Sequence, residues 1–232
     1  MVFTDYYGGG LFIVKADGKL DFKIPMKGNK TFAVTVVDCT TVAVSSGKPY
    51  SNDKACIRIT DIQSRGVTKT IYTESWCYGI VFADDKLVFC GYEPSGIFEI
   101  DLKTNTQSVI SSTIPLSNWS NISYVEKKFY VTNASTRTIT CCGNKGNVLW
   151  TYNDNVNMKA IRGFSVDTNG NAFVASENLK NVTMISHDGK RAKQILDTKD
   201  GLDAPYAMQY DRYTNRLLVA NQKGMAYLFG EQ

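Results

Sequence analysis

Histidine is almost missing from this chain, whose 232 residues include only His187. It lies in the segment SHDGK, which is typical of a solvated turn. A nucleophile of the Ser–His–Asp or Cys–His type therefore has at most this one imidazole to use. We also find no group of carboxylates that could supply the six to eight oxygen ligands of a hard cation. The sequence predicts no catalytic residues, no metal site and no cofactor.

Long apolar stretches are also missing. No run approaches the roughly 18 residues of a membrane-spanning helix, and the first ten residues, MVFTDYYGGG, lack the charged start and apolar run of a secretion signal. We therefore expect a soluble, cytoplasmic protein without a membrane partner. The net charge of +4 permits a polyanionic partner without requiring one, and no DNA partner is expected.

The six cysteines form no CxxC pair; they are Cys39, Cys56, Cys77, Cys90, Cys141 and Cys142. Most lie in apolar, strand-like runs such as KLVFC. This placement favours buried free thiols in a reducing compartment. Disulfides or a zinc site are the alternatives.

What the chain does contain is a series of short alternating runs rich in Val, Ile, Phe and Tyr, broken by Gly, Asn and Asp. No segment keeps a helical period beyond about ten residues, so the sequence predicts an all-β protein. The strongest runs are MVFTD (1–5), VAVS (42–45), LVFCG (87–91), FYVTN (129–133), AFVAS (172–176) and LLVAN (217–221). Their last residues, 5, 45, 91, 133, 176 and 221, are 40, 46, 42, 43 and 45 apart.

Most of these runs have further predicted strands before and after them. An apolar run precedes most of them, as in GFSVDT, and a loop and a second apolar run follow, as in NVTMISHD, before a turn and an outer strand. Four strands at a period near 43 predict one domain, residues 1–232, with the fold of a six-bladed β-propeller with four-stranded blades. We count 22 strands, which leaves the first and last blades incomplete. We expect either a longer parent chain, with about 20–25 further propeller residues upstream, or a ring that closes with 22 strands.

Three segments carry a family resemblance. IRGFSVDTNGNAFVASENLKNVTMISHDGKRAKQIL (161–196) resembles an NHL repeat. PYAMQYDRYTNRLLVANQKGMAYLF (205–229) resembles a shorter copy, and MVFTDYYGGGLFIVKADGKL (1–20) a third. The whole chain is similar to the C-terminal propeller of tripartite-motif (RING, B-box, coiled-coil) ubiquitin ligases, especially divergent invertebrate ones. The resemblance implies a module that binds protein clients or RNA. Any ligase activity would require a RING domain, and no RING-type Cys/His ligand set is present.

A six-bladed, metal-dependent hydrolase is the competing class. Such enzymes hold a cation on the propeller axis, yet the starts of the innermost strands here are mostly apolar or neutral, as in CYGIV and PYAMQ. The nearest acids, Glu74 and Asp203, have ordinary interpretations as loop residues. We therefore predict that the chain is not an enzyme.

Recognition by a surface is what remains. Loops that enter the first strand and loops that join the second and third strands emerge at one face of a propeller. There the sequence interleaves basic and aromatic residues with few acids (Glu74, Glu93, Glu177 and Asp203). The candidate ligand residues are Lys30, Lys48, Tyr50, Lys54, Trp76, Tyr78, Tyr92, Trp119, Arg137, Lys159, Arg162, Lys180, Tyr206 and Lys223, with Tyr6 and Tyr7 nearby.

Two ligand classes fit such a face. Aromatic platforms and cations suit single-stranded RNA, and Trp, Tyr and Arg equally dominate protein hot spots. Alternatively, about half of the aromatic rings only pack one blade against the next. Because the basic residues are spread along the chain and the net charge is modest, a protein client is favoured over RNA.

Overall fold

Strands formed by alternating apolar residues account for nearly all regular structure. The computed structural model describes residues 1–26, 30–50 and 53–230. Within these ranges it contains 22 strands and a single three-residue 3-10 turn, Thr198–Asp200. The predictions of an all-β chain with 22 strands are confirmed. None of the helical segments in these ranges is long and apolar enough to cross a membrane.

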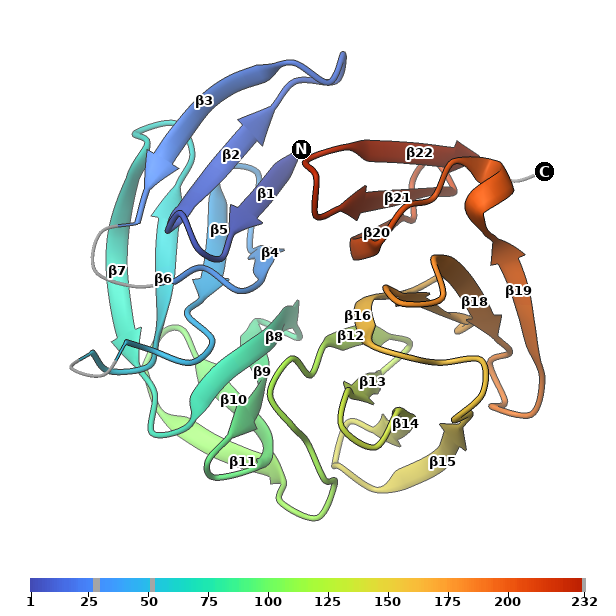
Figure 1. Cartoon of the computed structure of the whole chain (residues 1–232). Coiled ribbons are helices and arrows are strands. Elements are labelled where there is room, and N and C mark those ends of the chain that lie inside the picture. Colours follow the sequence, from blue (N-terminus) through green and yellow to red (C-terminus); the bar gives the residue numbers. More distant parts are fainter. Residues whose placement is uncertain (27–29, 51–52, 231–232) are drawn as a thin grey trace. The chain divides into compact units, whose positions relative to one another are not determined.

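Three antiparallel meanders make up the first half of the chain, in blue to green in Figure 1. The first blade has three strands, β1 (Val2–Asp5), β2 (Gly10–Val14) and β3 (Leu20–Pro25). The second has β4 (Val34–Val36), β5 (Thr41–Ser45), β6 (Cys56–Asp61) and β7 (Gly66–Tyr72). The third has β8 (Trp76–Ala83), β9 (Lys86–Tyr92), β10 (Gly96–Asp101) and β11 (Gln107–Ser111).

The second half repeats this arrangement, in green to red in Figure 1. The fourth blade has β12 (Ile122–Val125), β13 (Lys128–Asn133), β14 (Thr138–Gly143) and β15 (Val148–Asn153). The fifth has β16 (Ile161–Val166), β17 (Ala172–Ser176), β18 (Asn181–Ile185) and β19 (Ala192–Leu196). The last has three strands, β20 (Pro205–Asp211), β21 (Arg216–Asn221) and β22 (Ala226–Gly230). The predicted fold, a six-bladed β-propeller with incomplete first and last blades, is confirmed.

The middle strands supply the core of each blade. All five residues of β17 are buried, whereas the outer strand β19 has no buried residue. This difference arises because a middle strand has a hydrogen-bonded neighbour on each side, and its apolar side chains also pack against the next blade. The chain divides into two compact units, Met1–Asn118 and Trp119–Gln232, each with three blades. The prediction of one domain stays a prediction.

The cysteines belong mostly to these cores. All six, each within the described ranges, carry thiols that are not joined in disulfides, and Cys39 is exposed while the other five are buried. Burial raises the pKa of Cys142 to about 12, so this thiol stays protonated at neutral pH and acts as a small apolar side chain.

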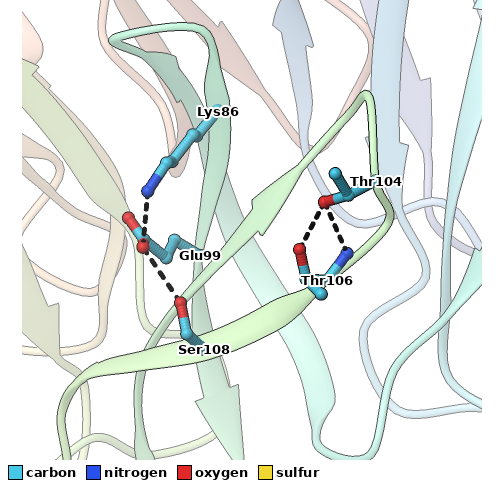
Figure 2. A network of polar contacts seen from close by, with 5 residues as sticks. All are labelled: Lys86, Glu99, Thr104, Thr106 and Ser108. Atoms are coloured by element: carbon cyan, nitrogen blue, oxygen red, sulfur yellow. Dashed lines mark hydrogen bonds and ion pairs between the residues drawn. The ribbon is translucent and has the colours of Figure 1, made fainter.

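Polar contacts tie the outer strands to the middle ones. In the third blade, Lys86 Nζ donates to Glu99 Oε1 over 2.7 Å, and Ser108 Oγ donates to the same oxygen over 2.9 Å (Figure 2). The hydrogen bond to Glu99 raises the pKa of Lys86. Thr104 and Thr106 share a hydroxyl hydrogen bond at the adjoining turn (Figure 2). Lys86, Glu99 and Ser108 thus join β9, β10 and β11 across the solvated surface of the blade.

Strands β16 and β20, the first strands of the last two blades, approach each other closely at Gly163. A Cβ added there would lie 2.9 Å from Met208 Cβ and 3.1 Å from the carbonyl carbon of Ala207. Neither atom is the free end of a flexible side chain, so β16 and β20 could not keep their separation if a methyl group were present.

This contact generates a prediction about stability. We expect Gly163→Ala to destabilise the protein by about 1–3 kcal/mol, because the added methyl group forces neighbouring strands apart. The matched control is Gly66→Ala, where the nearest atom to an added Cβ is 3.9 Å away. Urea unfolding measures both variants. Equal midpoints for the two would contradict the close approach.

Candidate functional site

Three first strands of the second unit place an aromatic and basic cluster at one end of their blades. Trp119 lies just before β12, Arg162 is the second residue of β16, and Tyr206 is the second residue of β20. Strand β16 packs against both β12 and β20, so residues that are far apart in the sequence meet here. We call Trp119, Arg162 and Tyr206 the Arg162 corner.

The guanidinium of Arg162 lies beside both rings. Its Cζ atom is 4.9 Å from the centroid of the Trp119 ring and 5.3 Å from that of Tyr206. The two rings meet edge to face at 84°, with centroids 5.9 Å apart. Such distances fit cation–π attraction. The two ring centroids are about as far from each other as each is from Cζ. Both rings therefore lie on the same side of the guanidinium and do not sandwich it.

Glu177, from the loop between β17 and β18, fixes the orientation of Arg162. The Nε atom of Arg162 donates to Glu177 Oε2 over 2.8 Å, and Gln222 Nε2 donates to the other carboxylate oxygen over 2.9 Å. The side chains of Arg162 and Glu177 are 26% and 18% exposed. An ion pair shielded to this extent holds its geometry better than a fully solvated one.

Backbone contacts support the same corner. Asn121 Nδ2 donates to the carbonyl of Arg162 over 2.8 Å and to that of Trp119 over 3.2 Å. Trp119 itself has a φ of +68°, a left-handed conformation that a tryptophan rarely adopts. The surrounding contacts therefore hold the indole in place at a local cost in backbone energy.

A second charged group, Lys180, Asp203 and Lys223, lies on loops of the fifth and last blades. Asp203 Oδ1 accepts from Lys180 Nζ over 2.9 Å, and its Oδ2 accepts from Lys223 Nζ over 2.6 Å. Hydrogen bonds from Lys223 and Lys180, followed by their positive charges, lower the pKa of Asp203 to about 2. Since Gln222 and Lys223 are adjacent in sequence, one loop contacts both Glu177 and Asp203.

In the first unit, an aromatic group surrounds a lysine. Lys30 Nζ lies 4.9 Å from the ring centroids of both Tyr6 and Tyr50, and it donates to the Tyr6 hydroxyl over 3.4 Å. Tyr7 packs edge-on against Tyr6. Burial, together with the neighbouring Tyr7 and Tyr50, raises the pKa of Tyr6. In this group, the Lys30 ammonium is held by cation–π contacts with two tyrosine rings and by a hydrogen bond to one of their hydroxyls.

A second pair of rings in this unit comes from β8 and β9. Lys48 Nζ lies 4.8 Å from the Trp76 ring centroid, and the Trp76 and Tyr92 rings are 5.8 Å apart. Tyr78 is only 2% exposed and packs edge-on against Phe32. Its ring therefore belongs to the core and offers little surface to a ligand.

For the remaining candidates, Lys54, Arg137 and Lys159, the described part of the chain gives no contact with the groups above. Lys54 and Lys159 are exposed, and half-buried Arg137 donates to the carbonyl of Asn155 over 3.4 Å. The structure thus brings five sequence candidates of the second unit into one charged and aromatic region: Trp119, Arg162, Lys180, Tyr206 and Lys223. Sequence reasoning missed the role of Gln222, since an isolated glutamine in a turn carries no signal of a bridging contact.

Metal ligands do not gather around these residues. Across residues 1–26, 30–50 and 53–230, no group of three or more His, Cys, Asp or Glu side chains could hold a metal ion. The contacts that the Arg162 side chain makes are a hydrogen bond to Glu177 and aromatic contacts with Trp119 and Tyr206.

Comparison with known proteins identifies the fold and no family. No protein-family model matches the chain, and no curated protein matches its sequence. A protein of unknown function from Bacteroides thetaiotaomicron is similar with a TM-score of 0.78 at 12% identity, over 98% of this chain and 65% of that one. A chain in the nidogen/laminin complex has a TM-score of 0.70 at 14% identity, over 99% of this chain and 92% of that one.

An enzyme shares the same fold. Virginiamycin B lyase from Staphylococcus aureus is similar with a TM-score of 0.68 at 13% identity, over 100% of this chain and 80% of that one. The prediction that the chain is not an enzyme is wrong as it stands, because this propeller fold does carry a lyase. The likeness extends to the fold alone, so it assigns no activity to this chain.

These comparisons also bear on the family resemblance noted in the sequence. They support a propeller fold of the kind that NHL repeats form, and they give no support to membership of the tripartite-motif ligases.

The lysine pair around Asp203 makes a prediction about pH. An Asp whose folded pKa is about 2 and whose unfolded pKa is near 3.9 stabilises the fold above about pH 4, and this contribution is lost as the pH falls toward 2. We expect NMR titration to place the Asp203 carboxyl near pH 2, and the Lys180→Gln/Lys223→Gln double variant to raise that value toward 4. The same pKa in both proteins would refute the assignment of the shift to the lysines.

Proposed function

We propose that this propeller is a protein-recognition module and that the Arg162 corner is part of its docking surface. The observation that supports this most directly is the contact of Trp, Arg and Tyr side chains, held in place by Glu177 and partly open to solvent. These three residue types contribute most to protein interfaces because they combine large apolar area with directional hydrogen bonding. Their orientation before binding lowers the entropy lost on association.

Charge favours a protein partner over RNA. Glu177 already pairs with Arg162, and Asp203 pairs with Lys180 and Lys223. Phosphate contacts by basic residues provide much of the affinity of RNA-binding proteins, and here the three basic residues are already paired with two carboxylates of the same chain. A propeller chain in the nidogen/laminin complex is consistent with protein recognition by this fold.

A peptide selection tests this proposal. A displayed library of random peptides is selected against the immobilised protein, and affinities of the enriched peptides are measured by calorimetry. We expect micromolar binders that lose about tenfold or more in affinity with Trp119→Ala and with Tyr206→Ala, because each substitution removes a ring that contacts Arg162.

The control is Tyr213→Ala, which truncates a fully exposed ring in the loop between β20 and β21. It should leave these affinities unchanged, and unfolding midpoints of all variants exclude a loss of fold. Binders that are insensitive to both corner variants would contradict the proposal. So would tighter, Trp119-dependent binding of random single-stranded RNA, which would favour the RNA alternative.

A further inference from the structure

We propose that the Arg162 corner recognises a carboxylate, supplied by an Asp or Glu side chain of the protein partner. This inference rests on the proposed function and names the chemistry by which the partner is held. It follows from the hydrogen-bond donors that Arg162 retains, from the side of the guanidinium that the rings leave open, and from the charges around it.

Arg162 keeps most of its donors. An arginine has five N–H groups, and in the described part of the chain the Arg162 side chain donates only through Nε, to Glu177 Oε2. Glu177 cannot readily rotate to accept from a second guanidinium nitrogen, because Gln222 holds its other oxygen over 2.9 Å. The two terminal nitrogens are therefore left with their four N–H groups.

The rings leave room for a ligand. Trp119 and Tyr206 meet edge to face and lie at one side of the guanidinium, and the Arg162 side chain is 26% exposed. The two terminal nitrogens form a planar fork whose spacing matches the two oxygens of a carboxylate. An acidic side chain of a partner can accept two parallel hydrogen bonds there while its methylene groups contact the rings.

The surrounding charge fits a single carboxylate. Arg162, Lys180 and Lys223 contribute three positive charges, and Glu177 and Asp203 contribute two negative ones, which leaves a net charge of +1. One incoming carboxylate neutralises this set. A phosphate group with nearly two negative charges would leave it negative, so the site fits an acidic side chain better than a phosphorylated one.

The structure assigns Glu177 an orienting role that a simple charge argument would miss. If the partner were attracted only by positive charge, Glu177→Ala would raise the net charge and strengthen binding. If Glu177 holds the fork in position, the same substitution weakens binding by several fold, because Arg162 gains rotamers that must be lost again. Glu177→Gln keeps an oxygen that can accept from Nε and should recover part of the affinity.

A double-mutant cycle tests the inference with a peptide from the selection described above. Each Asp and Glu of the peptide is replaced by Asn or Gln and titrated against wild type, Arg162→Gln and Arg162→Lys. We expect one acidic position whose neutralisation costs about tenfold or more with wild type and less than about twofold with Arg162→Gln. Arg162→Lys should not restore the loss, since an ammonium group lacks the planar fork.

Lys159→Gln provides the matched control, because it removes one positive charge from an exposed lysine three residues before Arg162. It should change affinity by less than about twofold at physiological salt. Trp119-dependent peptides whose acidic residues show no coupling to Arg162, or that bind Glu177→Ala more tightly than wild type, would overturn the carboxylate inference alone. The absence of any Trp119-dependent peptide would overturn this inference together with the proposed function.

Discussion

The close approach of β16 and β20 at Gly163 sets the geometry of the candidate site. A methyl group at this position would lie 2.9 Å from Met208 Cβ, so only a glycine lets the two strands pack at this separation. Arg162 precedes Gly163 and Tyr206 precedes Ala207, hence the contact that brings the backbones together also brings guanidinium and ring together. A packing constraint in the core thus determines the position of a polar group at the end of the blade.

Ion pairs then orient the side chains that this packing brings together. Glu177 accepts from Arg162 and Gln222, and Asp203 pairs with Lys180 and Lys223. These contacts hold the loop between β17 and β18 to the loop between β21 and β22. Glu177 uses both oxygens and Arg162 uses only Nε. Both oxygens of the carboxylate therefore have a partner while the two terminal nitrogens of the arginine have none among the described residues, and this asymmetry leaves donors available for a partner.

Much of the fold could be predicted from the sequence because it depends on local rules. Alternating apolar residues and turns with Gly and Asn predict the strand at 172–176 with the bounds that β17 has. The apolar run 32–37 predicts a longer strand than β4, which begins at Val34. There the pairing continues irregularly, because Phe32 and Ala33 both bond to the backbone of Ser45 while the Ala33 N–H donates to the Ser45 hydroxyl.

The site was less accessible to sequence reasoning. Residue type was enough to select Trp119, Arg162 and Tyr206 as candidates. Their partners could not be found in this way, because Glu177 lies 15 residues from Arg162 and Gln222 lies 45 from Glu177. Such contacts depend on loop conformation, including the positive φ of Trp119, and no periodicity encodes them.

The two ends of the fifth blade use their polar side chains differently, in a fold that this chain shares with a lyase and with a chain of the nidogen/laminin complex. At the turn between β16 and β17, Asp167 accepts from the backbone N–H groups of Asn169 and Asn171 and from the Asn171 amide, each over 2.8 Å. The carboxylate there serves the turn itself and is only 7% exposed. At the opposite end of β16, the Arg162 side chain is oriented through a single donor, Nε. A side chain that is oriented by its own protein and still retains most of its donors has the preorganisation that the proposed docking surface requires.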